Sequence, residues 1–229
     1  MSLADFGVTV VLAPHPDDET LGCGATLLRL KQETRGPLHW ILMTRMSKAA
    51  GYDAGAITRR DLEIDAVSKQ FGFDRRIQLP FGAATLDSEP TAALVQSMAT
   101  AFDELKPETL LMPFPADAHS DHARTFKIGS ACAKWFRRKH LRRIMCYEVL
   151  SETGFNLDPT RAAFEPNCYV KVAEDLIEQK IAIMAEYQTE MAPFPFPRSA
   201  EAIRALARVR GSECGATAAE AFVLVRDIC

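Results

Sequence analysis

The chain has 229 residues, of which 48% are hydrophobic and 25% are charged, and its formal net charge is −3 at pH 7. This balance excludes a disordered chain and provides for one sizeable hydrophobic core, so we expect a single domain over residues 1–229. The net negative charge argues against a protein that binds nucleic acid through its overall field.

The sequence also bears on membranes and on the cellular compartment. The longest apolar run, residues 8–14, is far shorter than the roughly 20 residues of a membrane span, so we expect no stable membrane insertion. The first residues lack the basic and hydrophobic segments of a secretory signal. Six cysteines are scattered without a CxxC pair, which favours reduced thiols and a cytoplasmic protein. We expect Cys23 to be a small buried core residue rather than a nucleophile.

Short β-branched or apolar segments alternate with longer segments of helical periodicity along the chain. The first part contains an expected strand (7–13), a helix (20–34), a strand (38–44), a loop (46–58), a helix (59–71) and a strand (76–79). The second part contains a helix (91–105), a strand (109–113), a helix (123–136), two strands (143–150 and 168–172), two helices (173–190 and 199–210) and a final strand (221–226). This alternation predicts a Rossmann-like, three-layer α/β/α fold with a mostly parallel sheet.

Two segments stand out from this alternation by composition. Residues 193–197 alternate proline and phenylalanine, and this hydrophobicity predicts a packed loop rather than a solvated linker. Residues 134–143 form the one basic cluster. The simpler interpretation is a solvated helix end favoured by the helix dipole, and the alternative is a surface that attracts an anionic carrier or a membrane.

Two polar clusters follow expected strands, at the positions where open α/β sheets bind ligands. Residues 15–19, with the sequence His-Pro-Asp-Asp-Glu, come directly after the first strand. Residues 117–122, with the sequence Asp-Ala-His-Ser-Asp-His, come shortly after the strand at 109–113. Three of the five histidines of the chain lie in these clusters, which are therefore the main candidates for a functional site.

The spacing within the clusters indicates a metal site. His15 and Asp18 are three residues apart, and so are His119 and His122. One His–Asp pair and one further histidine would supply two imidazoles and a carboxylate, and a catalytic metal would keep a position open for water. Asp17 and the remaining histidine would be free to act as general base and general acid. Acids that favour a helix N-terminus and a polar loop would explain each cluster alone, but their pairing favours the metal.

At these residues the sequence resembles the LmbE-like (PIG-L) superfamily of zinc-dependent N-deacetylases, which remove the acetyl group from N-acetylglucosamine on various carriers. Residues 15–19 resemble its first signature and residues 119–122 its second, and weaker similarities lie at 60–63, 71–72, 210–211 and 219–222. The resemblance implies a Zn²⁺ cofactor, with Fe²⁺ or another divalent transition metal as alternatives. It also implies an N-acetylated sugar as substrate, either a small molecule or linked to a lipid.

The same resemblance implies roles for individual residues. It assigns three metal ligands, namely His15, Asp18 and His122. Asp17 becomes the general base, and His119 becomes the general acid or an electrostatic stabiliser, oriented by Asp121. Arg60 matches a position that contacts the substrate in relatives, although an ion pair with Glu63 on the same helix would also explain it.

Three positions depart from the family pattern. Arg45 and Met46 follow Thr44 where the family often has Asp-Gly, and Asp117 replaces a tyrosine found in some members. Residues 187–190 read Tyr-Gln-Thr-Glu instead of Tyr-x-Ser-Gln. These departures leave the metal ligands unchanged. They fall in expected substrate loops, so the sequence leaves open the sugar, its aglycone, the native metal and the oligomeric state, and a homo-oligomer is compatible with it.

Two other functions match parts of the pattern. A non-haem iron(II) oxygenase would use the same two-histidine, one-carboxylate site, but the extra acid–base groups and the strand–helix alternation argue against it. A nucleotide-binding module would need a spaced glycine turn. Gly22 and Gly24 lie inside the expected first helix and lack the third glycine, so this signal is weak.

Overall fold

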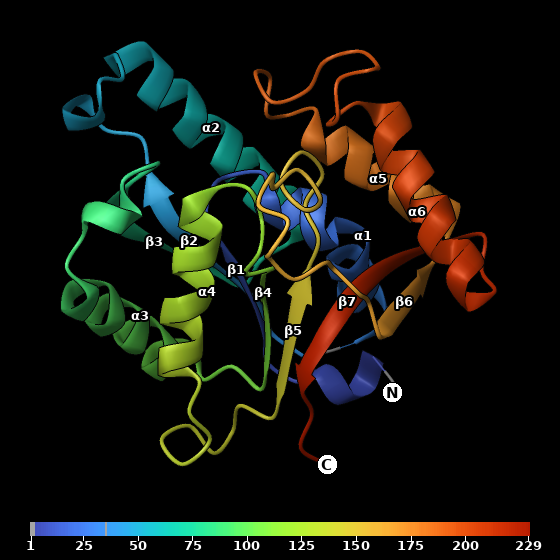
Figure 1. The fold of residues 1–229 in the computed structure, drawn as a ribbon, viewed down its shortest axis with the longest axis horizontal. Coiled ribbons are helices and arrows are strands. Elements are labelled where there is room, and N and C mark those ends of the chain that lie inside the picture. The colour runs from blue at the N-terminus through green and yellow to red at the C-terminus, as the bar shows by residue number, and fades with distance from the viewer. Residues whose placement is uncertain (1–2, 35) are drawn as a thin grey trace.

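The computed structural model describes residues 3–34 and 36–229, and strands and helices alternate along it (Figure 1). The strands are β1 (Thr9–Ala13), β2 (Leu38–Arg45), β3 (Arg75–Gly82), β4 (Thr109–Pro113), β5 (Arg143–Tyr147), β6 (Cys168–Val172) and β7 (Ala218–Arg226). The helices are α1 (Asp18–Glu33), α2 (Ala54–Phe71), α3 (Thr91–Leu105), α4 (Ser120–Cys132), α5 (Glu174–Met184) and α6 (Ala200–Cys214). Three short 3₁₀ turns lie at Leu3–Phe6, Lys48–Ala50 and Leu86–Ser88.

The strands form one seven-stranded sheet in the order β3-β2-β1-β4-β5-β7-β6. The first five of these strands run parallel, and β7 is antiparallel to both β5 and β6. The predicted α/β fold with a mostly parallel sheet is therefore confirmed. From β1 the chain proceeds to β2 and β3 on one side and then returns to β4 and β5 on the other. The carboxyl ends of β1 and β4 thus flank the point where strand order reverses, which is where such sheets bind ligands.

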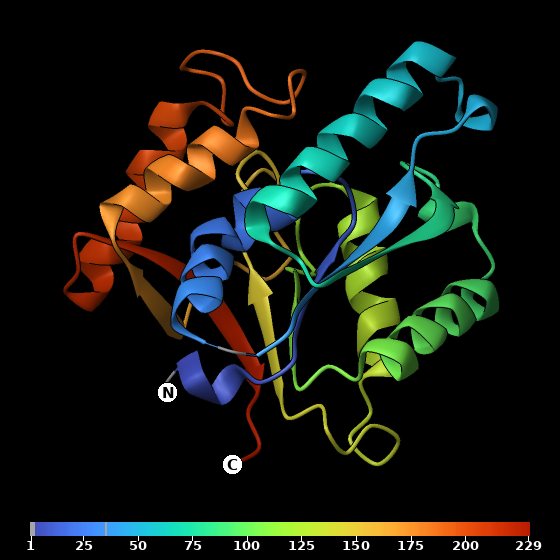
Figure 2. The same cartoon turned by 180° about the vertical axis from the view of Figure 1, so that it is seen from behind.

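Two helical layers bury the two faces of the sheet. Side chains of β1 alternate between them, because Val11 and Ala13 belong to one core cluster while Val10 and Leu12 belong to the other. Helices α1, α2, α5 and α6 pack on the first face, and α3 and α4 pack on the second (Figures 1 and 2). Both layers leave the carboxyl ends of the central strands open to loops.

Helix α1 contains a break that buried charges stabilise. Cys23 has φ −147°, outside the helical range, so nearby backbone groups lose their helical partners. The Leu21 carbonyl accepts a hydrogen bond from Lys180 Nζ at 2.8 Å. The Glu220 carboxylate accepts hydrogen bonds from the N–H groups of residues 25 and 26 at 3.1 and 2.6 Å. Lys180 and Glu220 are themselves paired at 2.6 Å, so the buried pair satisfies every group it meets at the break.

The glycines at this break serve close packing. A Cβ on Gly22 would collide with the ring of Tyr147, whose hydroxyl donates to the Leu12 carbonyl at 2.8 Å. A Cβ on Gly24 would lie 3.1 Å from the Lys180 side chain. Their place in α1 is explained by these contacts rather than by phosphate binding. Cys23 between them is fully buried, as expected.

Several element boundaries differ from the sequence prediction. Helix α2 begins at Ala54, inside the expected loop, because the Asp53 side chain caps it by accepting from the Ala56 N–H at 2.9 Å. Helix α4 begins at Ser120 and ends at Cys132, three and four residues before the expected ends. The basic segment 134–143 is consequently a loop that ends at Arg143, the first residue of β5, and not a helix end.

A further expectation about a loop is wrong. Residues 193–196 are exposed, so the expectation of a packed loop at 193–197 is wrong. In the basic loop, Arg138 turns inward and pairs with Asp103 at 2.8 Å, whereas Trp135 and Phe136 are exposed.

Among the residues that the structure describes, no helix is long and apolar enough to cross a membrane.

Candidate metal centre

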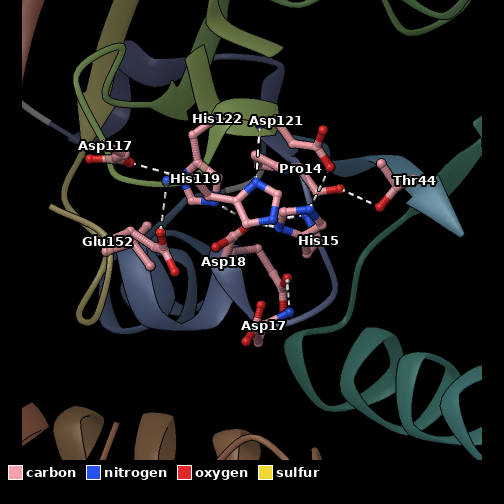
Figure 3. A network of polar contacts seen from close by, with 12 residues as sticks. Pro14, His15, Asp17, Asp18, Thr44, Asp117, His119, Asp121, His122 and Glu152 are labelled. Atoms are coloured by element: carbon pink, nitrogen blue, oxygen red, sulfur yellow. Dashed lines mark hydrogen bonds and ion pairs between the residues drawn. The ribbon is translucent and has the colours of Figure 1, made fainter. Parts of the chain in front are cut away.

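The turn after β1 carries the first polar cluster (Figure 3). The Pro14 carbonyl accepts a hydrogen bond from the Thr44 hydroxyl at 2.7 Å, which ties this turn to the end of β2. The His15 N–H donates to Asp18 Oδ2 at 2.9 Å across the turn. Asp17 has φ +128°, a backbone conformation that costs free energy for any residue but glycine and that is concentrated at functional sites.

The second cluster occupies the N-terminus of α4. His119 is the N-cap residue, and its Nδ1 accepts a hydrogen bond from the Asp121 N–H at 3.1 Å. His122 lies in the first turn of the helix and is buried. Because β1 and β4 are neighbours in the sheet, α4 brings this turn against the turn after β1.

One ligand atom from each of His15, Asp18 and His122 lies within 4.8 Å of the other two. Asp18 Oδ2 is 3.4 Å from His15 Nδ1 and 3.3 Å from His122 Nε2. Two ligands that bind a tetrahedral Zn²⁺ at about 2.0–2.1 Å are about 3.3–3.4 Å apart, which matches both distances. His122 Nε2 is also buried without a hydrogen-bond partner, as a nitrogen reserved for a metal would be. The residues present therefore fit a divalent transition metal.

Carboxylates outside this triad hold the two rings in place. His122 Nδ1 contacts Asp117 Oδ2 at 2.8 Å, and His15 Nε2 contacts Asp121 Oδ2 at 2.9 Å. In each ring one nitrogen is thus held by a carboxylate, and the other faces Asp18. Metal-binding histidines characteristically have such a partner on the far nitrogen, which fixes the ring orientation and tautomer.

The electrostatics of the triad favour a cation between its members. Burial alone would lower the pKa of His15, but its contacts with Asp121 and Asp18 raise it to about 9. The same competition raises the pKa of His122, through Asp18 and Asp117. Burial would raise the pKa of Asp18, but the two histidines hold it well below its usual range. In the absence of a metal, protons on the rings balance the charge of the buried carboxylates.

The position of Asp121 differs from the sequence expectation. Its carboxylate accepts from the backbone N–H groups of Ala84 and Leu86 at 2.7 and 3.1 Å and contacts the His15 ring. Only its own N–H reaches the His119 ring. Asp121 therefore orients His15 through its side chain, and it supports His119 through its backbone. Its place in the first turn of α4 lets one residue do both.

Asp17 points away from the three ligand atoms and into a charged network. Its carboxylate does not cap α1 and accepts a hydrogen bond from Arg198 Nη1 at 2.6 Å. Arg198 also pairs with Glu190 at 2.9 Å. Burial raises the pKa of Asp17 well above its usual value, Asp18 raises it further, and Arg198 opposes the shift. The expected acid–base residue thus lies beside the triad without belonging to it.

These groups line a cavity of about 390 Å³ at the carboxyl edge of the sheet. A volume in this range suits a small-molecule ligand. Besides the triad, Asp17 and His119, its walls come from β2 and the loop after it, from the loop after β3, from the segment 149–152, and from residues 189–198. The concave site, the switch-point position and the candidate metal therefore coincide.

A family model described as "PIG-L: GlcNAc-PI de-N-acetylase" matches residues 10–133, which is more than half of the chain. The chain belongs to the PIG-L (LmbE-like) family. Both polar clusters lie inside the matched segment, so the resemblance inferred from them is confirmed.

Solved structures share the PIG-L fold over nearly the whole chain. The conserved protein TT1542 from Thermus thermophilus is 27% identical, with a TM-score of 0.77 and 96% of each chain covered. N,N'-diacetylchitobiose deacetylase from Pyrococcus horikoshii is 18% identical, with a TM-score of 0.73 and coverage of 95% of this chain and 83% of that one. The A40926 pseudoaglycone deacetylase Dbv21 is 18% identical, with a TM-score of 0.72 and coverage of 96% and 98%. A comparison with curated protein sequences gave no match.

Within this PIG-L fold, Arg60 makes the ion pair expected from sequence and faces the cavity as well. Its Nε is 3.1 Å from Glu63, and its Nη2 is 2.5 Å from Glu190 and donates to Thr189 at 3.1 Å. Its Nη1 donates to the Pro16 carbonyl at 3.4 Å. The ion pair expected from sequence is therefore present, and Arg60 also lines the cavity, so its contact with a substrate stays a prediction.

The site also contains several residues that lie outside the PIG-L motifs. Asp117 could be noticed in the sequence only as a departure from the family, yet it holds His122. Glu190 stands in another of the departing segments and pairs with Arg60. Arg198 follows the proline-rich loop, and no local pattern in the sequence marks it as a partner of Asp17.

Proposed function

We propose that this protein is a metal-dependent hydrolase that removes the N-acetyl group from an N-acetylglucosamine-type sugar or glycoconjugate. The observation that carries the proposal is the pairing of a three-ligand triad with Asp17 and His119 at its side, inside a PIG-L fold. His15 Nδ1, Asp18 Oδ2 and His122 Nε2 would hold the metal. A bound Zn²⁺ lowers the pKa of its water to about 7 and polarises a carbonyl.

Asp17 is proposed as the general base. Its carboxylate accepts the proton of the attacking water while the water oxygen bonds to the acetyl carbon. The raised pKa of Asp17 suits a group that must retain this proton. When the C–N bond breaks, the same proton passes to the leaving nitrogen, and the products are acetate and a free amine.

His119 is proposed as a hydrogen-bond donor to the reacting group. Burial lowers its pKa, so the ring is neutral near pH 7. Because Nδ1 accepts the Asp121 N–H, the proton of the neutral ring is on Nε2. An Nε2–H at the cavity can stabilise negative charge on the acetyl oxygen, which is the electrostatic role expected from sequence, whereas the proton of the departing amine comes from Asp17 rather than from His119 as general acid.

The iron(II) oxygenase alternative is not favoured. Membership in the PIG-L family supports a hydrolase, and an oxygenase has no use for a carboxylate base beside its ligands. The native metal remains part of the proposal, with Zn²⁺ first and Fe²⁺ or another divalent transition metal as alternatives. We further propose that residues 1–229 form one deacetylase domain.

The test is a panel of N-acetylated sugars incubated with the Zn²⁺-loaded protein. We expect equimolar release of acetate and primary amine from at least one of them, and an Asp17→Asn variant with intact metal should release neither at a comparable rate. Consumption of oxygen with an α-keto acid, without release of amine, would contradict the proposal.

A further inference from the structure

The cavity beside the triad contains an arginine whose side chain has no partner among residues 3–34 and 36–229. Three arginines line this cavity: Arg45, Arg60 and Arg198. Arg60 is paired with Glu63 and Glu190, and Arg198 is paired with Asp17 and Glu190. The Arg45 side chain makes no hydrogen bond or ion pair with any residue in the part of the chain that the structure describes.

Neighbouring residues fix the backbone of Arg45 but not its side chain. It is the last residue of β2 and the only exposed one in that strand. Thr44 before it is buried and bonds to the Pro14 carbonyl, next to the triad residue His15. Across the sheet, Arg45 is in register with Gly82, which has no side chain to oppose it. The backbone is therefore anchored to the metal-binding turn, and the guanidinium is left free.

The wall that contains Arg45 differs in charge from the other walls. Met46 and Tyr52, which continue this wall, supply a thioether and an aromatic ring but no carboxylate. Elsewhere the cavity is lined by Glu152, whose carboxylate accepts the His119 N–H at 3.0 Å. A neutral ligand that covered Arg45 would remove water from a guanidinium without replacing its hydrogen bonds, which is unfavourable. A ligand with an anionic group would supply the missing partner.

We propose that Arg45 is a specificity-determining residue, and that the natural substrate carries an anionic group, a phosphate or a carboxylate, on the part that does not react. A guanidinium binds either group through two parallel hydrogen bonds. With the acetyl group at the triad, this anion would lie against the wall formed by Arg45, Met46 and Tyr52. The inference rests on the proposed function, because it describes the rest of the molecule whose amide is cleaved.

The first experiment measures binding, independently of turnover. Three probes are titrated calorimetrically into the Zn²⁺-loaded protein at low salt: N-acetylglucosamine 1-phosphate, the carboxymethyl glycoside of N-acetylglucosamine, and the neutral methyl glycoside. At least one anionic probe should bind about tenfold more tightly than the neutral one, as expected for a charge-assisted pair in a partly enclosed site. Added salt should reduce this preference. Comparison of the two anionic probes distinguishes phosphate from carboxylate.

Variants identify the residue responsible for the preference. Arg45→Met should lower the affinity for the anionic probes to that for the methyl glycoside, and Arg45→Glu should reverse the preference. Arg59→Met is the matched control, because Arg59 is exposed on α2 and does not line the cavity. A preference that survives in Arg45→Met would mean that the anion binds the metal or another group, and it would overturn the inference. Equal binding of all three probes, or no binding, would overturn it too.

Release of amine, measured on the same samples, separates this inference from the proposed function. If the neutral and anionic probes are deacetylated with equal kcat/KM and equal affinity, the proposed function stands and the role of Arg45 is wrong. If the anionic preference depends on Arg45 but no probe releases amine or acetate, the anion site stands and the deacetylase proposal loses its support.

Discussion

His122 shows how a single residue is prepared for a metal. Its ring is almost fully buried, Asp117 holds one nitrogen at 2.8 Å, and the other nitrogen faces Asp18 at 3.3 Å. Asp117 is in turn held by the Thr153 hydroxyl at 2.6 Å. This chain of contacts determines the ring orientation before any metal binds. Folding therefore already arranges this ligand, and metal binding need not reorient it.

Replacing Asp117 should therefore weaken the metal site although Asp117 binds no metal. In Asp117→Asn, the amide cannot act as a charged acceptor for both His122 and Thr153, so the ring loses its fixed orientation. We expect about 10- to 100-fold weaker Zn²⁺ binding in competition with a chromophoric chelator. Glu152→Gln is the control, because Glu152 contacts the backbone of His119 and neither ligand ring. Equal losses in the two variants would contradict the assigned role.

The raised pKa values of the ligand histidines predict a pH dependence of metal binding. The pKa of His15 is raised to about 9 and that of His122 is raised as well, so both rings carry a proton at pH 7 in the metal-free protein. A metal requires neutral rings, so its binding must release these protons, and its affinity should increase as the pH rises towards 9.

Calorimetry in buffers of different ionisation enthalpy measures this release. We expect between one and two protons per metal at pH 7, and fewer in Asp121→Asn, which removes the contact that raises the pKa of His15. Zn²⁺ affinity that does not change between pH 6 and pH 8 would show that the rings are already neutral.

Among the elements, α1 depends most on distant partners. It carries Asp18 at its first residue, and its break at Cys23 is stabilised by Lys180 from α5 and Glu220 from β7. Its first turn is therefore fixed by elements that lie far along the chain.

Lys180→Met should strongly destabilise the fold. It leaves the Glu220 carboxylate buried without a counter-charge and the Leu21 carbonyl without a donor, and breaking a buried pair from one side costs about 3–5 kcal/mol. Urea unfolding measures this loss. Arg204→Met is the control, since its pair with Glu178 is largely solvated and its removal should have little effect. Similar midpoints for the two variants would mean that the buried pair contributes nothing at the break.

The elements also show what the sequence could and could not predict. Strand and helix order was predictable, because buried strands such as β1 and β4 are short apolar runs. The boundaries of the elements were less predictable, since the start of α2 depends on the cap by Asp53 in a segment without periodicity. The solvent exposure of residues 193–196 contradicts their hydrophobicity, which composition alone cannot anticipate.

The same distinction applies to the site. Its three candidate ligands occur in two short motifs. Local spacing predicted two imidazoles and a carboxylate, and the resemblance to the family selected His122 from the second motif. The partner of Asp17 is 181 residues away in sequence, on a loop without a motif, and only the fold brings Arg198 to it. The contact of the Asp121 carboxylate with His15 rather than His119 was equally unpredictable, because sequence spacing does not show which ring a carboxylate faces.

In the whole molecule, the site joins segments that are far apart in sequence and that the neighbouring strands β1 and β4 bring together. The triad links the turn after β1 to the N-terminus of α4, so a metal that binds the folded state adds to global stability. Free Zn²⁺ at 100 times its dissociation constant should raise the free energy of unfolding by about 2.7 kcal/mol. Thermal unfolding with and without Zn²⁺ measures the shift, and His122→Ala should show none. An equal shift in that variant would place the metal elsewhere.

In the proposed mechanism, the neighbouring aspartates have different tasks: Asp18 holds the metal and Asp17 acts as the base. The most direct measurement is metal content and deacetylation rate, determined side by side for the wild type, Asp17→Asn and Asp18→Asn. Asp18→Asn should lose metal, because a neutral amide is a poorer ligand than a carboxylate. Asp17→Asn should keep the metal and lose about 10²- to 10⁴-fold in turnover. Loss of metal in Asp17→Asn with retention in Asp18→Asn, or full turnover in Asp17→Asn, would contradict the account.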